Sequence, residues 1–335
     1  MKIFGKDPAQ DLIVIAEIGV NHEGGLEYAK ELIRLAASTG ADAVKFQSYT
    51  PERYACKENM ERFERVSRFG LSKEDHLELI DVAKSSGIEF FSTPLSEDWV
   101  EFLNEHSNAF KIASGDITFE PVIRAVAATG KHFIISTGAA NIEEIDRAVD
   151  WVKDEIGEDK AKENFALMHC ICSYPAPIEQ SNVLSVPFLA ERYGLHVGYS
   201  NHVIEPEACL AAVALGANII EVHFTDKKTD RDFHDHALSF EPQELTNLIK
   251  SANLIKKSLG NLGKFVQPCE QDLVPLVRKG VVAAHDISAG HVLTQDDLIY
   301  ARPSTEFSSA ELKDLIGKTL NQNIAAGHLI KRESV

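Results

Sequence analysis

Two apolar runs that both end on a histidine, Leu195-His-Val-Gly-Tyr-Ser-Asn-His202 and Ile219-Ile-Glu-Val-His223, flank a helical segment. Near-continuous apolar runs are typical of strands that are buried on both faces of a parallel sheet. In strand–helix barrels the chemistry sits where the strands end, so we expect both histidines to project into one cavity. Two neutral imidazoles beside carboxylates suit a divalent metal, although either histidine alone could be a packed residue with one hydrogen bond.

Working outward, six further apolar runs precede this pair, and amphipathic segments separate them. The expected strands are Leu12–Ile18, Ala43–Gln47, Glu89–Thr93, Ala109–Ser114, His132–Thr137, Phe165–Cys170, Leu195–Ser200 and Ile219–His223. The expected helices include Leu26–Ser38, Lys73–Ser85, Phe119–Ala128, Ile142–Ile156, Glu205–Leu215 and Pro242–Leu259. Eight strand–helix units predict an α/β fold, a closed (β/α)8 TIM barrel; a doubly wound open sheet is the alternative.

The pattern changes after Gly260, which divides the chain into a barrel of residues 1–260, a linker of residues 261–273 and a small domain of residues 274–335. Within the small domain we expect β-like pieces at Val281–Ala284, Leu298–Ala301 and His328–Lys331, and short helices at Thr294–Leu298 and Ser309–Leu315. A core of about sixty residues is marginal alone. We therefore expect this domain to lean on the barrel or on another subunit.

The net charge of the chain limits the classes of molecule that it is expected to bind. A net charge of -17 argues against nucleic-acid binding and against docking on anionic membranes. It leaves room for an anionic small molecule, because a few cationic side chains can line one pocket. The five cysteines show no framework spacing, and neither a signal pattern nor a membrane-spanning apolar run is present, so we expect reduced thiols in a cytoplasmic protein.

Ionisable and hydroxyl side chains stand at the ends of the expected strands, where a packed core would exclude them. These residues are Glu17, Lys45, Gln47, Thr93, Lys111, Ser114, Asp116, Ser136, Tyr174, Ser200, His202, Glu221 and His223. Lysines, hydroxyls and tight glycines form a cradle for phosphate or carboxylate, whereas carboxylates and histidines supply metal ligands and proton-transfer groups. The pattern predicts a metal-assisted enzyme that acts on an anionic, phosphorylated small molecule. The alternative is that Lys45 and Lys111 only balance Glu17 and Asp116.

A charged run, Asp226–Asp235, follows the last expected strand. We interpret it as a solvated loop, except for Asp235, which opens the motif Asp235-His-Ala-Leu-Ser239.

An ordered series of motifs covers nearly the whole chain. In the barrel it comprises Ile15-Ala-Glu17-Ile-Gly-Val-Asn-His22-Glu-Gly, Ala43-Val-Lys45-Phe-Gln47, Ser92-Thr93-Pro94, Phe110-Lys111-Ile-Ala-Ser114-Gly, Ser136-Thr-Gly138, Met168-His-Cys170 with Tyr174-Pro175, Gly198-Tyr-Ser200-Asn-His202, Glu221-Val-His223-Phe-Thr and Asp235-His-x-x-Ser239. The series resembles the sialic acid (N-acetylneuraminate) synthase family. The tail, with Arg278, Val281-Val-Ala, Asp286-Ile, Gly290, Leu293-Thr, Arg302-Pro303 and Gly327, resembles that family's antifreeze-like (SAF) α+β domain.

The resemblance implies condensation of phosphoenolpyruvate with an N-acyl amino-sugar aldose to give a nine-carbon α-keto acid and phosphate. It assigns a divalent cation, Mn²⁺ or Mg²⁺, to His202 and His223. It assigns the carboxylate of phosphoenolpyruvate to Lys45 and Thr93, its phosphate to Lys111, Ser114, Ser136 and Ser200, the proton of water or sugar to Glu17, and the sugar to Gln47, Asp116, Tyr174 and Asp235. It further implies a domain-swapped homodimer in which Arg302 completes the partner's site.

Five features depart from the family pattern: Asp116 stands for glutamate, Cys172 for asparagine, Asn201 for aspartate and Ser304 for glycine, and Asp226–Phe233 lacks the usual Pro-Gly before the Asp-His pair. They leave three acceptors open, namely N-acetylmannosamine, its phosphate, and a diacetamido-trideoxy hexose of the legionaminic or pseudaminic type. Two other functions compete with the synthase: a metal-dependent pyruvate aldolase and a non-catalytic sugar-binding homologue.

Overall fold

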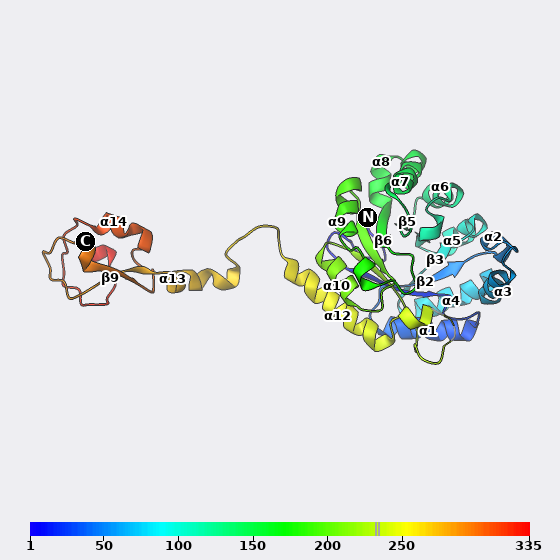
Figure 1. Cartoon of the computed structure of the whole chain (residues 1–335), viewed down its shortest axis with the longest axis horizontal. Coiled ribbons are helices and arrows are strands. Elements are labelled where there is room, and N and C mark those ends of the chain that lie inside the picture. The colour runs from blue at the N-terminus through cyan, green and yellow to red at the C-terminus, as the bar shows by residue number, and fades with distance from the viewer. Residues whose placement is uncertain (232, 234) are drawn as a thin grey trace. The chain divides into compact units, whose positions relative to one another are not determined.

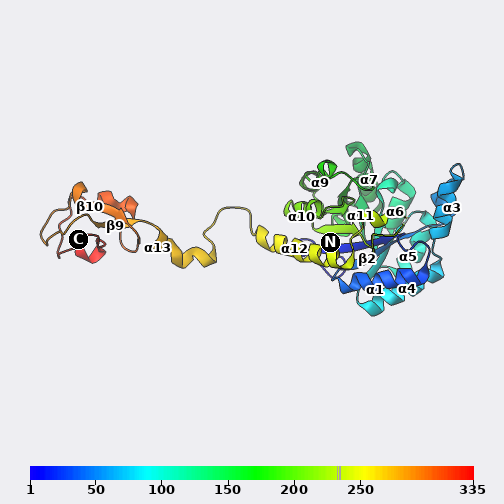
Figure 2. The same ribbon diagram turned by 60° about the horizontal axis from the view of Figure 1, so that its bottom comes forward.

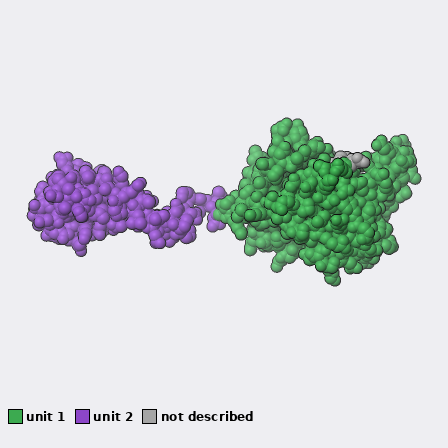
Figure 3. Space-filling model, turned by 90° about the horizontal axis from the view of Figure 1, so that it is seen from below, with its two compact units in different colours: residues 1–260 green, residues 261–335 purple. Residues whose placement is uncertain are grey.

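The chain folds into two compact units, Met1–Gly260 and Asn261–Val335, coloured separately in Figure 3. This computed structural model describes residues 1–231, 233 and 235–335. Within that part of the chain no helix has both the length and the apolarity that crossing a membrane requires.

The first unit is a closed barrel of parallel strands that follow one another in chain order (Figure 1). The strands are β1 (Ile13–Gly19), β2 (Ala43–Ser48), β3 (Glu89–Pro94), β4 (Ala109–Ile112), β5 (His132–Ser136), β6 (Phe165–Cys170), β7 (Val197–Asn201) and β8 (Ile219–His223). β1 and β8 pair in parallel from Ile13 opposite Ile219 to Glu17 opposite His223, which closes the ring. The predicted TIM barrel is thereby confirmed, and the open-sheet alternative is wrong.

Helices cover the outside of the barrel, and α1 packs beside α4 (Figure 2). The helices of this unit are α1 (Leu26–Ser38), α2 (Pro51–Tyr54), α3 (Met60–Phe69), α4 (Lys73–Ser86), α5 (Val100–His106), α6 (Glu120–Ala128), α7 (Ile142–Ile156), α8 (Glu158–Asn164), α9 (Ser185–Tyr193), α10 (Glu207–Ala214), α11 (Asp235–Leu238) and α12 (Pro242–Leu259). Reciprocal side-chain caps begin two of them, Ser72 with Asp75 at α4 and Asn141 with Glu144 at α7. Such a cap stabilises a helix by about 1 kcal/mol.

The barrel interior is filled in layers. Its apolar layer is formed by Ile13, Ile15, Ala43, Phe91, Ala109, Ile134, Ala166, Met168 and Ile219, together with Ile3 from the N-terminal segment. Side chains alternate between the two faces of a strand, so residues two positions further on point inward again. Gly198 belongs to this interior because a Cβ there would lie 2.9 Å from Met168 Cε, whose side chain takes the space.

The second unit has its own apolar core around Val281, Leu298, Phe307, Leu315 and Ile330. Its sheet is an antiparallel pair, β9 (Gly280–Ala283) and β10 (Leu298–Ala301). Its other elements are α13 (Val274–Val277), α14 (Leu312–Leu315) and short 3-10 turns, one of them Pro268–Leu273.

Two details of the predicted small domain are wrong. His328–Lys331 is not a strand, since only Leu329 forms an isolated bridge to Val282, and Thr294–Leu298 reduces to the 3-10 turn Gln295–Asp297. Short segments of this kind make too few backbone hydrogen bonds for the sequence pattern to distinguish them from turns. The division of residues 261–335 into a linker and a domain stays a prediction.

Candidate active site

A cavity of about 700 Å³ opens at the carboxyl ends of the strands, and every strand contributes to its lining. The innermost contributors lie two positions beyond the apolar layer of each strand; they are Glu17, Lys45, Thr93, Lys111, Ser136, Cys170, Ser200 and Glu221. Cavities of this size hold small-molecule substrates. These eight residues form a polar ring above the apolar layer. Both sets face inward because side chains alternate between the two faces of each strand.

Two lysines and two glutamates form the floor of this cavity. Lys45 Nζ lies 3.1 Å from Glu17 Oε2 and 3.5 Å from Glu221 Oε2, while Lys111 Nζ lies 3.6 Å from Glu221 Oε1. All four residues are buried. The predicted pairing of Lys45 with Glu17 is present, but Lys111 pairs with Glu221 instead of Asp116. Burial of each ion costs several kcal/mol, so these charges persist only as a set.

The two glutamates differ in their affinity for a proton. Burial and the neighbouring charge of Glu221 raise the pKa of Glu17 above its ordinary value, against the pull of Lys45. Burial also works to raise the pKa of Glu221, but Lys111, Lys45 and a hydrogen bond from Ser200 outweigh it and lower that pKa. The surroundings therefore favour the ionised form of Glu221, whereas Glu17 holds a proton more readily than an ordinary glutamate.

The pKa values of the two lysines shift in opposite directions. Burial opposes the charge on Lys45, but Glu17 and Glu221 outweigh it and raise its pKa. Burial dominates at Lys111 and lowers its pKa. The two ammonium groups at the floor of the cavity are charge-assisted hydrogen-bond donors of the kind that an anionic group accepts from.

Hydroxyl groups surround the lysines. Ser136 Oγ accepts from Lys111 Nζ at 2.7 Å, Thr93 Oγ1 from Lys45 Nζ at 3.4 Å, and Ser200 Oγ donates to Glu221 Oε1 at 2.9 Å. The Gly138 backbone N–H donates to Ser114 Oγ at 3.0 Å, and a Cβ at Gly138 would come within 2.8 Å of that oxygen. Only glycine allows this approach, which brings a backbone turn against the hydroxyls.

The two predicted metal ligands face each other. The ring centroids of His202 and His223 lie 5.3 Å apart, and Tyr174 lies 4.0 Å from the first and 5.9 Å from the second. His202 Nδ1 donates to Ile171 O at 2.6 Å, which leaves Nε2 with its lone pair. His223 Nδ1 is buried and makes no hydrogen bond to the described residues, and it lies 3.8 Å from Asp235 Oδ2.

Burial lowers the pKa of both rings, to about 4 for His223, so both are neutral near pH 7. Two neutral imidazoles with free ring nitrogens beside a carboxylate fit a divalent cation. Within the described part of the chain, no set of three or more His, Cys, Asp or Glu side chains is arranged to hold a metal ion. Two imidazoles alone would leave the other coordination positions to water and substrate.

The outer cavity is lined by the residues predicted to grip the sugar: Gln47, Asp116, Tyr174 and Asp235. Gln47 Nε2 donates to Glu17 Oε1 at 3.4 Å, which links this region to the charged floor. Burial raises the pKa of Asp116 to about 6. Every predicted site residue of the barrel thus lines one cavity, whereas Arg302 lies in the second unit, exposed just after β10.

Three lining arginines, Arg53, Arg62 and Arg65, were missed by the sequence reasoning. They belong to α2 and α3, two short helices inserted after β2. The apolar periodicity of these helices is too short for the sequence to predict them. Arg53 pairs with Glu97 at 2.7 Å, and Arg62 lies over the Tyr54 ring at 5.8 Å. The predicted solvated loop is also partly wrong, because Asp226 and Arg231 form a half-buried ion pair at 2.9 Å; residues 232 and 234 of that loop lie outside the described residues.

This fold and site define an enzyme of the (β/α)8-barrel class whose cavity has a floor of buried lysines and glutamates. The NeuB family model matches residues 32–264, and the SAF domain model matches residues 278–335. The chain therefore belongs to the NeuB family, the sialic acid synthase family that its motifs predicted, and it carries a C-terminal SAF domain.

Named relatives agree with this assignment. The chain is 37% identical to N,N'-diacetyllegionaminic acid synthase of Campylobacter jejuni, over 95% of this chain and 98% of that protein. It is 31% identical to human N-acetylneuraminate-9-phosphate synthase, over 96% and 92%. The crystal structure of N-acetylneuraminic acid (sialic acid) synthetase from Leptospira borgpetersenii, in complex with citrate, superposes with a TM-score of 0.73 at 36% identity, over 79% of this chain and 90% of that one.

The ligand assignment predicts that His202→Ala abolishes tight Mn²⁺ binding, because one imidazole of the facing pair is lost. Isothermal titration with Mn²⁺ should show at least a tenfold weaker Kd, about 1.4 kcal/mol or more. His169→Gln is the matched control, because His169 is a buried histidine of β6 that bonds to Ser181 O at 2.8 Å and does not line the cavity. Wild-type affinity in His202→Ala would refute the assignment.

The raised pKa of Asp116 predicts a pH dependence of acceptor binding. Below about pH 6 the carboxyl is protonated and no longer accepts hydrogen bonds from sugar hydroxyls as an anion, so kcat/KM for the acceptor should fall as the pH drops through 6. Asp116→Asn should remove that inflection while lowering the plateau. A wild-type inflection that persists in Asp116→Asn would assign it to another group.

Proposed function

We propose that this protein condenses phosphoenolpyruvate with an N-acyl amino-sugar aldose to give a nine-carbon α-keto acid and inorganic phosphate. The observation that carries the proposal is the buried set Lys45, Lys111, Glu17 and Glu221 beside the paired imidazoles of His202 and His223. It combines an anion cradle, a proton-labile carboxylate and a metal-binding pair in one cavity. The family assignment supports the same reaction.

Phosphoenolpyruvate is held at the floor of the barrel. Lys45 and Thr93 bind its carboxylate, and Lys111 with Ser114, Ser136 and Ser200 binds its phosphate. The C3 carbon of the enol forms a bond to the aldehyde carbon of the open-chain sugar, and the aldehyde oxygen takes up a proton. Water adds to C2 and releases one proton, which balances the proton taken up by the aldehyde oxygen. The C2–O bond to phosphate then breaks, and the C2 hydroxyl passes its remaining proton to the departing phosphate, which leaves the ketone. A cation on His202 and His223 would polarise the aldehyde oxygen as a Lewis acid.

Glu17 is the group that moves a proton in this scheme. Its raised pKa lets the carboxylate accept a proton from the attacking water or return one to the sugar oxygen. Gln47 and Lys45, which contact it at 3.4 and 3.1 Å, hold it in place. Glu221 is excluded from this role because the two lysines keep it ionised.

The acceptor occupies the outer cavity, against Gln47, Asp116, Tyr174 and Asp235. The named relatives make legionaminic-type and phosphorylated neuraminic-type acids, so the candidate acceptors are N-acetylmannosamine, its phosphate and a diacetamido-trideoxy hexose. We place the reaction in the cytoplasm, in keeping with the free cysteines.

The proposal predicts that phosphoenolpyruvate, Mn²⁺ and one of these three sugars together release inorganic phosphate and form one α-keto acid per phosphate, measured by phosphate assay and mass spectrometry. Lys45→Met should lower kcat/KM at least about a hundredfold, since a charge-assisted contact to the substrate is lost. Formation of free pyruvate from the keto acid without phosphate would favour the aldolase. Tight sugar binding with no turnover would favour the non-catalytic homologue.

We also propose a domain-swapped homodimer in which Arg302 of one subunit serves the partner's cavity. Arg302 is exposed on the second unit, and it is available for such a contact.

Swapping predicts complementation. Arg302→Ala and Lys45→Met should each be inactive, yet a dissociated and reassociated mixture should regain up to about a quarter of wild-type activity, because one site in the mixed dimer keeps both residues. Reassociated single variants are the controls. An inactive mixture that nevertheless contains mixed dimers, shown by mass spectrometry, would contradict the arrangement.

A further inference from the structure

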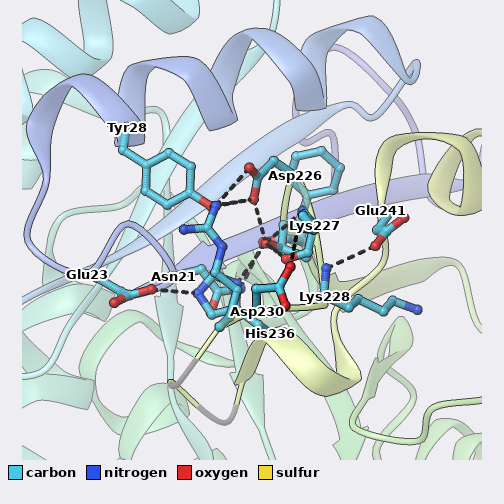
Figure 4. Close-up of polar contacts among 12 residues, drawn as sticks. Asn21, Glu23, Tyr28, Asp226, Lys227, Lys228, Asp230, His236 and Glu241 are labelled. Carbon is cyan, nitrogen blue, oxygen red and sulfur yellow. Dashed lines mark hydrogen bonds and ion pairs between the residues drawn. The ribbon is translucent and has the colours of Figure 1, made fainter.

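Polar contacts outside the cavity connect the segment after β1 to the segment after β8 (Figure 4). We call residues 20–25 the β1 loop and residues 224–241 the β8 loop. The β8 loop contains α11, a single helical turn whose first residue is Asp235. An isolated turn of this length does not hold its own conformation in water. The direction of Asp235 therefore depends on what secures α11.

One connection reaches the backbone of Asp235 itself. Asn21 Nδ2 donates to Ser239 Oγ and to Phe224 O, both at 2.9 Å, and Ser239 Oγ donates to Asp235 O at 2.7 Å. Asn21 and Ser239 are fully buried. These hydrogen bonds connect the segments that follow β1 and β8 to the backbone carbonyl of Asp235.

A second connection holds the next residue of the same turn. His236 Nε2 lies 3.1 Å from Glu23 Oε1, and His236 Nδ1 lies 2.7 Å from Thr225 Oγ1. Burial lowers the pKa of His236, so the neutral ring donates from Nε2 to the carboxylate and accepts at Nδ1 from the hydroxyl. The ring is thus fixed from both loops.

A third connection secures the start of the β8 loop. The Arg231 guanidinium contacts Asp226 at 2.9 Å and the Tyr28 hydroxyl at 2.7 Å, and it lies 4.7 Å from the Tyr28 ring centroid. Tyr28 belongs to α1, so this contact connects the β8 loop to a helix on the outside of the barrel.

Glu23 adopts a left-handed backbone conformation, with φ of +52°. This conformation is unfavourable for glutamate and costs glycine nothing. Backbone strain of this kind persists where the surroundings require the side chain. The contact with His236 is a specific reason for glutamate at this position.

We propose that Glu23 and His236 are positioning residues that hold α11 so that Asp235 faces the acceptor end of the cavity, and that they thereby determine acceptor affinity. Asp235 lines the cavity, and its Oδ2 lies 3.8 Å from His223 Nδ1. Neither positioning residue lines the cavity among the described residues. The proposal rests on the proposed function, because it assigns the sugar to Asp235.

The test compares two substitutions at one position. Glu23→Gly removes the contact and relieves the backbone, whereas Glu23→Gln keeps an oxygen that can accept from His236. We expect Glu23→Gly to raise the KM for the acceptor about threefold to tenfold, as for one lost hydrogen bond, with kcat and the KM for phosphoenolpyruvate within about twofold. Glu23→Gln should stay within about twofold of wild type in all three. Glu27→Gln, on the exposed face of α1, is the surface control.

Thermal unfolding separates positioning from general destabilisation, since Glu23→Gly should keep the wild-type Tm or exceed it. Equal rises in both KM values, an unchanged acceptor KM, or the same defect in Glu23→Gln would overturn the proposal. If the wild type condenses no sugar, the proposed function fails, and hydrogen exchange decides the positioning claim alone. Faster exchange of the α11 amides in Glu23→Gly then supports it, and unchanged exchange refutes it.

Discussion

The mutual neutralisation of Lys45, Lys111, Glu17 and Glu221 inside the barrel is the constraint on which the site depends. Each ion alone would cost several kcal/mol to bury, and loss of one partner leaves an uncompensated charge that costs about 3–5 kcal/mol. The closed barrel arranges β1, β2, β4 and β8 around one axis, so that the four charged side chains pair with one another and offset the cost of burial. The same four residues form the floor of the cavity, and Glu17 is the member whose carboxyl pKa is raised. Stability and chemistry are therefore coupled at these four positions.

Strand alternation explains why so much of the cavity could be predicted from sequence. Ile13, Ile15 and Glu17 share the inward face of β1. In the other strands, too, the inward-facing residue two positions after the apolar layer belongs to the polar ring. A run that ends on an ionisable residue therefore marks both a strand and its site residue. This rule needs no knowledge of the strand register.

The partners of these residues required the register and the closure of the barrel. Lys111 meets Glu221 across the interior from β4 to β8, a contact that no local pattern indicates. Arg53, Arg62 and Arg65 come from an excursion without strand or long-helix periodicity. The polar sequence of the charged run after β8 predicted a solvated loop. Asp226 and Arg231 of this run nevertheless form a half-buried ion pair. Charge content alone does not reveal such pairing.

Closure through β1 and β8 has a consequence for biosynthesis. Glu17 is made early and Lys45 soon after it, but Glu221 and both imidazoles emerge only when most of the barrel has left the ribosome. Until then β1 has one exposed edge, and its carboxylate faces a half-built interior that water still fills. The ring cannot close before β8 has been made, so a stalled or truncated product would expose an unpaired edge of β1, and such edges promote aggregation.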